Sequence, residues 1–423
     1  MFKSQVFTPQ GLCAHCTLSI LVLTTSLSPM LALPLASPAL AQVVSQQSAP
    51  TWAAAVDRAA ERLGLAAIAE ARTQEGAALD SLARSRFAGP LEADGGVRQD
   101  ALGSGFGYVE AEVGLMAPLW RRGERDLLRA QASAGGALAR ASQTALKLEA
   151  AGEVRARWWA LAAARAAASE DARQVGLARE VVTVTARLVD GGEMARLDLR
   201  QAEIAAADAT RRAEESAAEA EAARIAFAAL VGDPAPVLGE EAQGPATGEH
   251  PLVLLASAQS QSLRARQALA SASGAPRWRV GVDVRAERGM RGEDLGVSTG
   301  LRAARALGPD PSARAEGAAL GSEAAQADAN LRRVTLDVEA GIAQARARLA
   351  SSRAALRQAE LANAAAADAL ALTERGRREG ELSFLEELRA RSAAADAART
   401  LALARVAASA ATSNLNQAYG LLP

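Results

Sequence analysis

The sequence predicts a mainly α fold with a small β part, in which a strand hairpin followed by two long antiparallel helices occurs twice. Alanine-rich runs with helical spacing extend far beyond the usual length of a helix in a globular domain. A short glycine-containing break divides each pair of runs, as expected for the tip of a helical hairpin. The two breaks, residues 192–198 and 380–386, share the pattern Gly-Glu-apolar-small-x-Leu-acid.

The sequences around the two tips stay in register over a long distance. With an offset of 188 residues, Val154, Leu161, Arg165, Thr185, Gly192, Glu193 and Leu197 correspond to Ile342, Leu349, Arg353, Thr373, Gly380, Glu381 and Leu385. Such an offset is far longer than the roughly 20–50 residues of a solenoid repeat. We therefore expect a duplicated half, with a first repeat over residues 42–231, a linker over 232–250 and a second repeat over 251–423.

The composition argues against several classes of function. The 423 residues carry a formal net charge of -1, which gives no electrostatic basis for binding nucleic acid. The two cysteines, Cys13 and Cys16, lie near the start of the chain with His15 between them, and His250 is the other histidine. Without that first segment the chain has no thiol, so thiolate metal sites and histidine-based triads are not expected. We expect neither an enzyme nor a bound cofactor or metal, and we expect His250 to be structural or solvated.

Residues 1–41 have the pattern of a secretory signal peptide. Lys3 provides the positive start, residues 17–33 provide the apolar stretch, and residues 39–41 provide the Ala-Leu-Ala ending that signal peptidase reads. A membrane anchor is the alternative, which Pro29, Pro34 and Pro38 and the small-residue ending disfavour. No later run of about 18 apolar residues predicts a membrane helix.

Each half contains a predicted strand hairpin after its first helical segment, at about residues 85–118 and 277–303. In the first hairpin, residues 85–91 alternate weakly, a glycine-rich stretch over 94–107 is expected to be a flexible surface loop, and residues 106–117 form a clear strand. In the clear strands apolar and charged residues alternate, so each strand has one apolar and one charged face.

The remaining segments have helical periodicity. They cover residues 51–84, 124–187, 197–230, 252–272, 312–373 and 383–419. The proline-free run over 124–187 would be about 95 Å long at 1.5 Å per residue. A helix of that length predicts a coiled coil or a helical barrel, because an ordinary globular domain could not bury it. Trp158 and Trp159 lie within it, and we expect them to be packing anchors rather than a ligand site.

The predicted strands fit a membrane barrel. Their length is near the roughly 9–11 residues that a tilted strand needs to cross a bilayer, and their alternation suits lipid on one side and water on the other. Four strands cannot close into a barrel, because the smallest barrels need about eight strands. Three copies would supply about twelve strands, so the pattern favours a homotrimer in contact with membrane lipid.

This organisation resembles the outer membrane efflux protein family, the TolC-like channels. The most specific marks are Ala117-Pro118-Leu119 and Gly123 after the first hairpin, and the two glycine tips, each followed by an acid, Asp198 or Glu386. The resemblance implies a trimeric outer-membrane β-barrel with a periplasmic α-helical tunnel. Most of the chain would lie in the periplasm. It also implies two protein partners, a periplasmic adaptor and an inner-membrane pump, in a tripartite efflux or secretion system.

Two candidate sites follow from this resemblance. The hairpin tips are expected to dock the adaptor through Gly192, Glu193, Met194, Gly380, Glu381 and Leu382. The first turns of the returning helices are expected to form the periplasmic entrance gate, with Asp198, Glu386, Glu387 and Arg389 as candidates. Rings of carboxylates favour cations, and nearby arginines could bond to them: Arg196, Arg377, Arg378 and Arg389.

Each of these expectations has an alternative explanation in which the residues have only a structural role. The glycines could form passive turns, and the acids could merely cap helices, each contributing roughly 0.3–1 kcal/mol. For the whole chain, the alternative is a periplasmic coiled-coil scaffold without a pore. That alternative explains the helices but not the two alternating hairpins at matching places.

Overall fold

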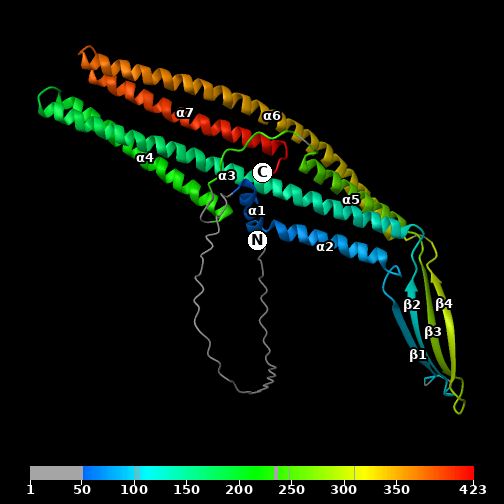
Figure 1. Ribbon diagram of the computed structural model, residues 1–423. Helices are drawn as coiled ribbons and strands as arrows, with labels where there is room; N and C mark the ends of the chain where they lie inside the picture. Colours follow the sequence, from blue (N-terminus) through cyan, green and yellow to red (C-terminus); the bar gives the residue numbers. More distant parts are fainter. Residues whose placement is uncertain (1–50, 101, 104, 233–236, 247, 309) are drawn as a thin grey trace, which may run out of the picture. The chain divides into compact units, whose positions relative to one another are not determined.

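The computed structural model describes residues 51–423 except 101, 104, 233–236, 247 and 309, and these residues belong to one compact unit, Ala49–Pro423 (Figure 1). The predicted signal peptide, residues 1–41, lies outside the described residues. The helices are α1 (Trp52–Arg62), α2 (Leu65–Arg84), α3 (Glu124–Asp190), α4 (Arg196–Val231), α5 (Pro251–Ser273), α6 (Pro311–Arg378) and α7 (Phe384–Ala418). The strands are β1 (Glu92–Gln99), β2 (Val109–Pro118), β3 (Trp278–Arg288) and β4 (Gly296–Arg305).

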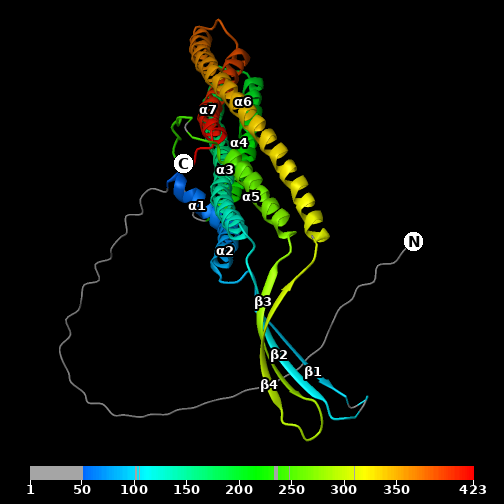
Figure 2. The same ribbon diagram turned by 90° about the vertical axis from the view of Figure 1, so that its right-hand side faces the viewer.

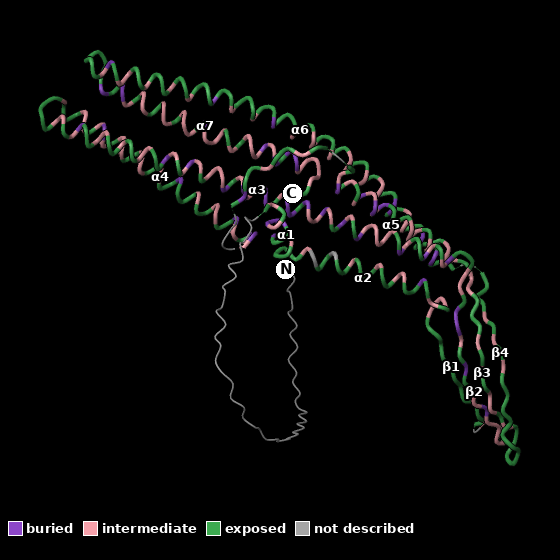
Figure 3. The backbone as a smooth tube through the Cα atoms, viewed as in Figure 1, coloured by how far each residue is buried: buried purple, intermediate pink, exposed green. Residues whose placement is uncertain are grey.

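The predicted fold class is confirmed: long helices dominate, and a small antiparallel sheet is the β part. α3 and α6 contain 67 and 68 residues, and each pairs with a shorter returning helix, α4 or α7 (Figure 1). α2 and α5 lie along the remaining length of α3, and α5 also packs on α6. Alanine is the residue most compatible with such uninterrupted helices, because it loses no side-chain entropy. Each helix packs against few neighbours. Buried positions therefore form narrow seams, and most of the helical surface is exposed or half-buried (Figure 3).

The sheet has the order β1-β2-β3-β4, with every neighbouring pair antiparallel. It continues from one end of the helices, while both hairpin tips lie at the other end (Figures 1 and 2). The prediction for the first strand was wrong: residues 85–91 form no strand, and β1 instead occupies residues 92–99, most of which lie in the stretch expected to be a loop. Glycine has a low strand propensity, yet Gly95 and Gly96 pair in register with Val113 and Glu112 of β2. Pairing with a strong neighbouring strand overrides that local preference.

Gly64 interrupts the first predicted helix, because its φ of +70° separates α1 from α2. Near this break, α1 covers a buried cluster at the middle of α3. Trp158 packs on Phe227 with ring centroids 5.6 Å apart, and Trp159 packs on Trp52 at 6.3 Å. The two tryptophans of α3 therefore act as packing anchors, as expected.

A buried ionic junction joins α3 to the segment between the repeats and to the end of the chain. Arg155 is 1% exposed, and its guanidinium makes two bonds to Glu241 and others to Gln417 Oε1 and to the Leu421 carbonyl. Ser413 Oγ also donates to Glu241, over 2.6 Å. Residues 237–246 thus contain no helix or strand but are held by specific bonds.

His250 has the structural role expected of it. It is the residue before α5, and its Nδ1 accepts a hydrogen bond from the Leu252 amide over 3.2 Å. Burial lowers the pKa of the imidazole. The neutral ring can accept this bond and so cap the helix.

Candidate functional site

The two hairpin tips have the same backbone. Gly192 and Gly380 have φ values of +78° and +81°, a conformation that favours glycine. At the first tip the Glu193 amide donates to the Leu188 carbonyl over 2.8 Å, and at the second the Glu381 amide donates to the Gly376 carbonyl over 2.9 Å. These bonds close each helix with the same glycine-ended motif. Both glycine breaks are therefore the tips of helical hairpins, as their sequence predicted.

The tip residues are not equally exposed. Gly192, Glu193, Gly380 and Glu381 are exposed, whereas Met194 is half-buried. Leu382 is 37% exposed, and its side chain folds back over α6. A Cβ on Gly376 would lie 2.8 Å from Leu382 Cδ1, so this buried glycine makes room for the leucine.

Two of the predicted gate acids, Asp198 and Glu386, cap the returning helices. Asp198 Oδ2 accepts a hydrogen bond from the Ala195 amide over 3.3 Å. Glu386 Oε2 accepts bonds from the amide and the hydroxyl of Ser383, over 2.8 and 2.9 Å. These bonds, with a smaller contribution from the nearby charge of Arg389, hold the pKa of the Glu386 carboxyl below its usual value.

The arginines expected near these acids behave differently from one another. Arg389 acts on Glu386 only through its charge, and Arg378 donates to the Glu374 carbonyl over 3.2 Å. Among the described residues, no ion pair joins Arg196, Arg377 or Arg378 to Asp198 or Glu386. Arg377 pairs with Glu387 instead.

Glu387 is the centre of an ionic cluster between α6 and α7. It is 3% exposed, it pairs with Arg377 of α6, and it accepts two bonds from Arg391 over 3.0 and 2.8 Å. Arg391 also lies 2.7 Å from Glu374 of α6. Sequence reasoning named Glu387 as a gate candidate but missed this cross-helix role. The four-residue spacing of Glu387 and Arg391 indicates their pair within α7 but not the contacts with α6.

The sheet has one apolar face with little covering it. Val97, Val113 and Leu301 from three strands are 73%, 64% and 90% exposed, and most other positions of that face in β2, β3 and β4 are valines, alanines and a leucine. Monomeric soluble proteins rarely expose a continuous apolar surface of this kind. The predicted alternation of the strands is thus confirmed on this face.

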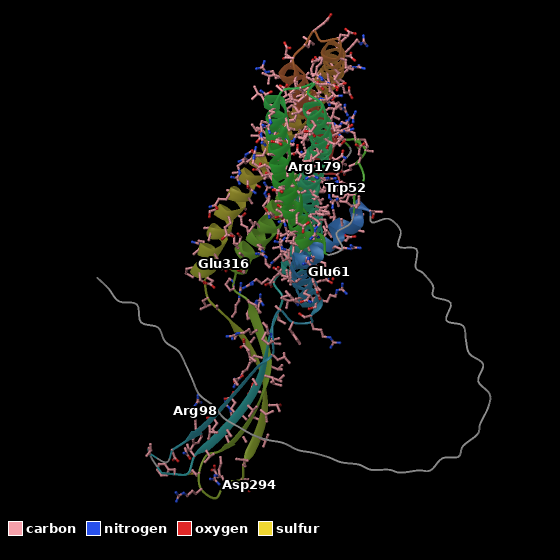
Figure 4. All side chains as sticks on the ribbon, turned by 90° about the vertical axis from the view of Figure 1, so that its left-hand side faces the viewer. Trp52, Glu61, Arg98, Arg179, Asp294 and Glu316 are labelled. Carbon is pink, nitrogen blue, oxygen red and sulfur yellow. The ribbon has the colours of Figure 1, made fainter. Side chains whose placement is uncertain are left out.

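The opposite face carries the charges. Arg285 Nε lies 3.2 Å from Glu110 Oε1, and Arg279 Nη1 lies 3.0 Å from Glu92 Oε2. Arg302 pairs with acids of the three other strands. Figure 4 shows Arg98 and Asp294 toward the loop end of the sheet, far from Glu316 near the start of α6. The charged face thus extends along the strands rather than forming a single patch.

A groove of about 540 Å³ lies between the two helical hairpins. Asp171 of α3 and Arg399 of α7 line it and form an ion pair of 3.1 Å, and Arg212 of α4 reaches Asp396 of α7 at 3.7 Å. Within the described residues no group of three or more His, Cys, Asp or Glu side chains could hold a metal ion. None of the helices in that part of the chain is both long and apolar enough to cross a membrane.

Comparison with known proteins identifies the fold. No family model and no curated protein matches the sequence. Among solved structures, the outer membrane protein VceC from Vibrio cholerae is 16% identical and has a TM-score of 0.70, over 86% of this chain and 95% of that chain. The CmeC outer membrane channel of Campylobacter jejuni is 15% identical, with a TM-score of 0.69 over 94% and 95%.

A third similar structure is the open state of the MtrE outer membrane channel of Neisseria gonorrhoeae. It is 18% identical and has a TM-score of 0.66, over 88% of this chain and 89% of that chain. In all three comparisons the likeness covers both the long helices and the sheet, since it extends over most of each chain. The chain therefore has the TolC-like fold of the outer membrane channels, as its sequence indicated.

Proposed function

We propose that this protein is the outer membrane channel of a tripartite efflux or secretion system. Substrate would pass from an inner-membrane pump, through a periplasmic adaptor, into the helical tunnel and out through the barrel. The observation that carries this proposal is the four-stranded sheet, with an exposed apolar face and a charged face, at one end of the helices. A coiled-coil scaffold has no use for such a sheet, and an enzyme would need a convergent set of reactive groups.

The channel would be a homotrimer. In one protomer β1 and β4 each have a free edge within the described sheet, and open edges in lipid cost several kcal/mol per unsatisfied backbone group. Three sheets would close into one barrel of about twelve strands, with the apolar face toward lipid. Most of the chain would then lie in the periplasm. The proposed domain limits are residues 42–231, 232–250 and 251–423, after removal of residues 1–41.

The first experiment is extraction of the protein from outer membranes, followed by mass measurement and recording in planar bilayers. We expect a detergent-dependent trimer, a protomer that begins at Gln42, and ion conductance. A folded single protomer that is released without detergent would support the scaffold instead.

The hairpin tips would dock the adaptor. A Cβ built on Gly192 or Gly380 meets nothing within 4 Å, so a side chain there would point into open space. Alanine at both positions costs only backbone strain, about 1–2 kcal/mol each, while tryptophan adds bulk where a partner would bind. We expect the double tryptophan variant to lose export and the double alanine variant to keep most of it, with equal amounts of trimer. Equal export by both variants would leave the glycines as passive turns.

The acids Asp198 and Glu386 would form the entrance gate, together with Glu387 and Arg389. Changing Asp198 to Asn and Glu386 to Gln keeps the shape and part of the capping but removes charge. Single-channel recordings should then show higher conductance or weaker cation preference. Unchanged recordings from an assembled trimer would leave these two acids with the capping role alone.

A further inference from the structure

One arginine on the charged face of the sheet contacts acids from all three other strands. Arg302 of β4 places Nη1 2.9 Å from Asp94 Oδ2 of β1 and Nε 3.2 Å from Asp283 Oδ1 of β3. It also pairs with Glu112 of β2. In a flat sheet β1 and β4 would be roughly 14 Å apart, so a direct pair between these edge strands shows that the sheet curls toward its charged face.

The two aspartates occupy matching places in the two hairpins. Asp94 is the register partner of Gly114, and Asp283 is the register partner of Gly300. A Cβ on Gly114 would lie 2.8 Å from Asp94 Oδ1, and a Cβ on Gly300 would lie 2.7 Å from Asp283 Oδ1. Each glycine therefore provides the space into which the opposite carboxylate leans. The duplicated hairpins thus bring two equivalent carboxylates to a single guanidinium.

Arg302 alone balances these two aspartates. In the described part of the chain, no other cation lies within ion-pair distance of Asp94 or Asp283. Glu112 has a second partner, because Arg285 Nη2 lies 3.6 Å from its Oε2. The Arg302 side chain is 33% exposed, so the cluster is in contact with solvent and would face any solute that passes along this side of the sheet.

We propose that Arg302 sets the charge preference of the barrel lumen by neutralising Asp94 and Asp283. This inference rests on the proposed function, because it requires the curled charged face to line a pore. In a trimer, loss of the three arginines would leave six aspartates at one level of the lumen without a cation. Rings of carboxylates select for cations, and charges separated by less than the Debye length of about 8 Å act together at physiological salt.

The test is the reversal potential of single channels under a salt gradient, with the full-length protein purified from membranes. We expect Arg302→Gln to raise the cation-to-anion permeability ratio severalfold. The matched control is Arg279→Gln on the same face, because Glu92 is the one acid that pairs with Arg279 among the described residues, and loss of Arg279 frees one carboxylate per protomer. Its effect should be clearly smaller. An Arg302→Gln channel with wild-type selectivity, or one no different from Arg279→Gln, would overturn the inference.

A second variant should change the permeability ratio in the opposite direction. It tests the inference even if the Arg302→Gln protein does not assemble. Changing both Asp94 and Asp283 to Asn leaves Arg302 without its two aspartates, so the permeability ratio should fall below that of the wild type. An unchanged ratio in this variant would contradict the inference. A wild-type protein that forms no conducting pore would instead refute the proposed function, so the two failures are distinguishable.

Discussion

The two hairpin tips share a backbone but differ in how their helices are held together. Both end in a glycine of positive φ and the same closing hydrogen bond. At the second tip, buried Glu387 joins α6 and α7 through Arg377 and Arg391. The residues of the first tip that correspond to Glu387 and Arg377 are Leu199 and Val189, which cannot form ion pairs.

This difference shows which features of a duplicated hairpin are fixed. The turn needs a residue that tolerates positive φ, so glycine is kept in both copies. The contact between the two helices can be apolar or ionic, provided that buried charges are paired. The two tips therefore present the same turn on differently stabilised helices, and changes at matching positions should have unequal effects.

The largest expected effect is at Glu387. Changing it to Gln removes the carboxylate that pairs with Arg377 and leaves Arg391 with Glu374 as its remaining acid, and we expect the second tip to lose about 2 kcal/mol of local stability. Hydrogen exchange of the amides over residues 374–391 measures this loss. The exposed acid Glu381, changed to Gln, is the control and should have little effect. Equal exchange in both variants would mean that the ionic cluster does not stabilise the tip.

A smaller effect is expected from exchanging the capping residues. Ser383 precedes α7, and its Oγ accepts a hydrogen bond from the Glu386 amide over 3.2 Å, whereas Ala195 holds the matching place before α4. Ser383→Ala should destabilise the second tip by about 1 kcal/mol.

The converse change, Ala195→Ser, should stabilise the first tip by a similar amount, because its hydroxyl can bond to the amides of the first turn. Local exchange rates at the two tips should therefore move in opposite directions. If the exchange rates at the two tips changed in the same direction, the two residues would not have equivalent capping roles.

The smallest effect on the stability of the tips is expected from lowering the pH. Bonds from Ser383 lower the pKa of Glu386 in the folded protein relative to an unfolded chain. The stability that this carboxylate contributes is therefore complete above its unfolded pKa, about 4.3, and is lost as the pH falls through the folded value. Amide exchange near residue 386, corrected for intrinsic rates, should increase over that acidic range. Glu386→Gln should abolish this dependence, and a pH profile that survives the substitution would assign it to another group.

The sequence revealed the helices and tips more readily than their contacts. Alanine-rich periodicity and the breaks at Gly192 and Gly380 mark the long helices, because both signals are local. The first strand was misplaced, because Gly95 and Gly96 have poor strand propensity and β1 depends on pairing with β2. Glu387 lies on a helix rich in charges, and only the packing of α7 on α6 distinguishes it from exposed Glu386.

The contacts of Arg302 could not be predicted for a related reason. Alternation places it on the charged face, but its bonds to β1, β2 and β3 depend on the curl of the sheet. Curl arises from tertiary packing and has no local sequence signal in these strands. The register partners Gly114 and Gly300 become informative only when they are seen opposite Asp94 and Asp283.

The junction at Arg155 has a consequence for the order in which the chain can fold. Glu241 lies 86 residues after Arg155, and Gln417 lies 262 residues after it. The Arg155 guanidinium therefore gains all its partners only when residues 417–421 have been synthesised. Contacts of such long sequence separation form slowly. A chain that ends before Ser413 would keep this arginine without several of its partners. We therefore expect a chain cut before Ser413 to be less stable around the middle of α3, and to be cleaved there by proteases sooner than the longer chain.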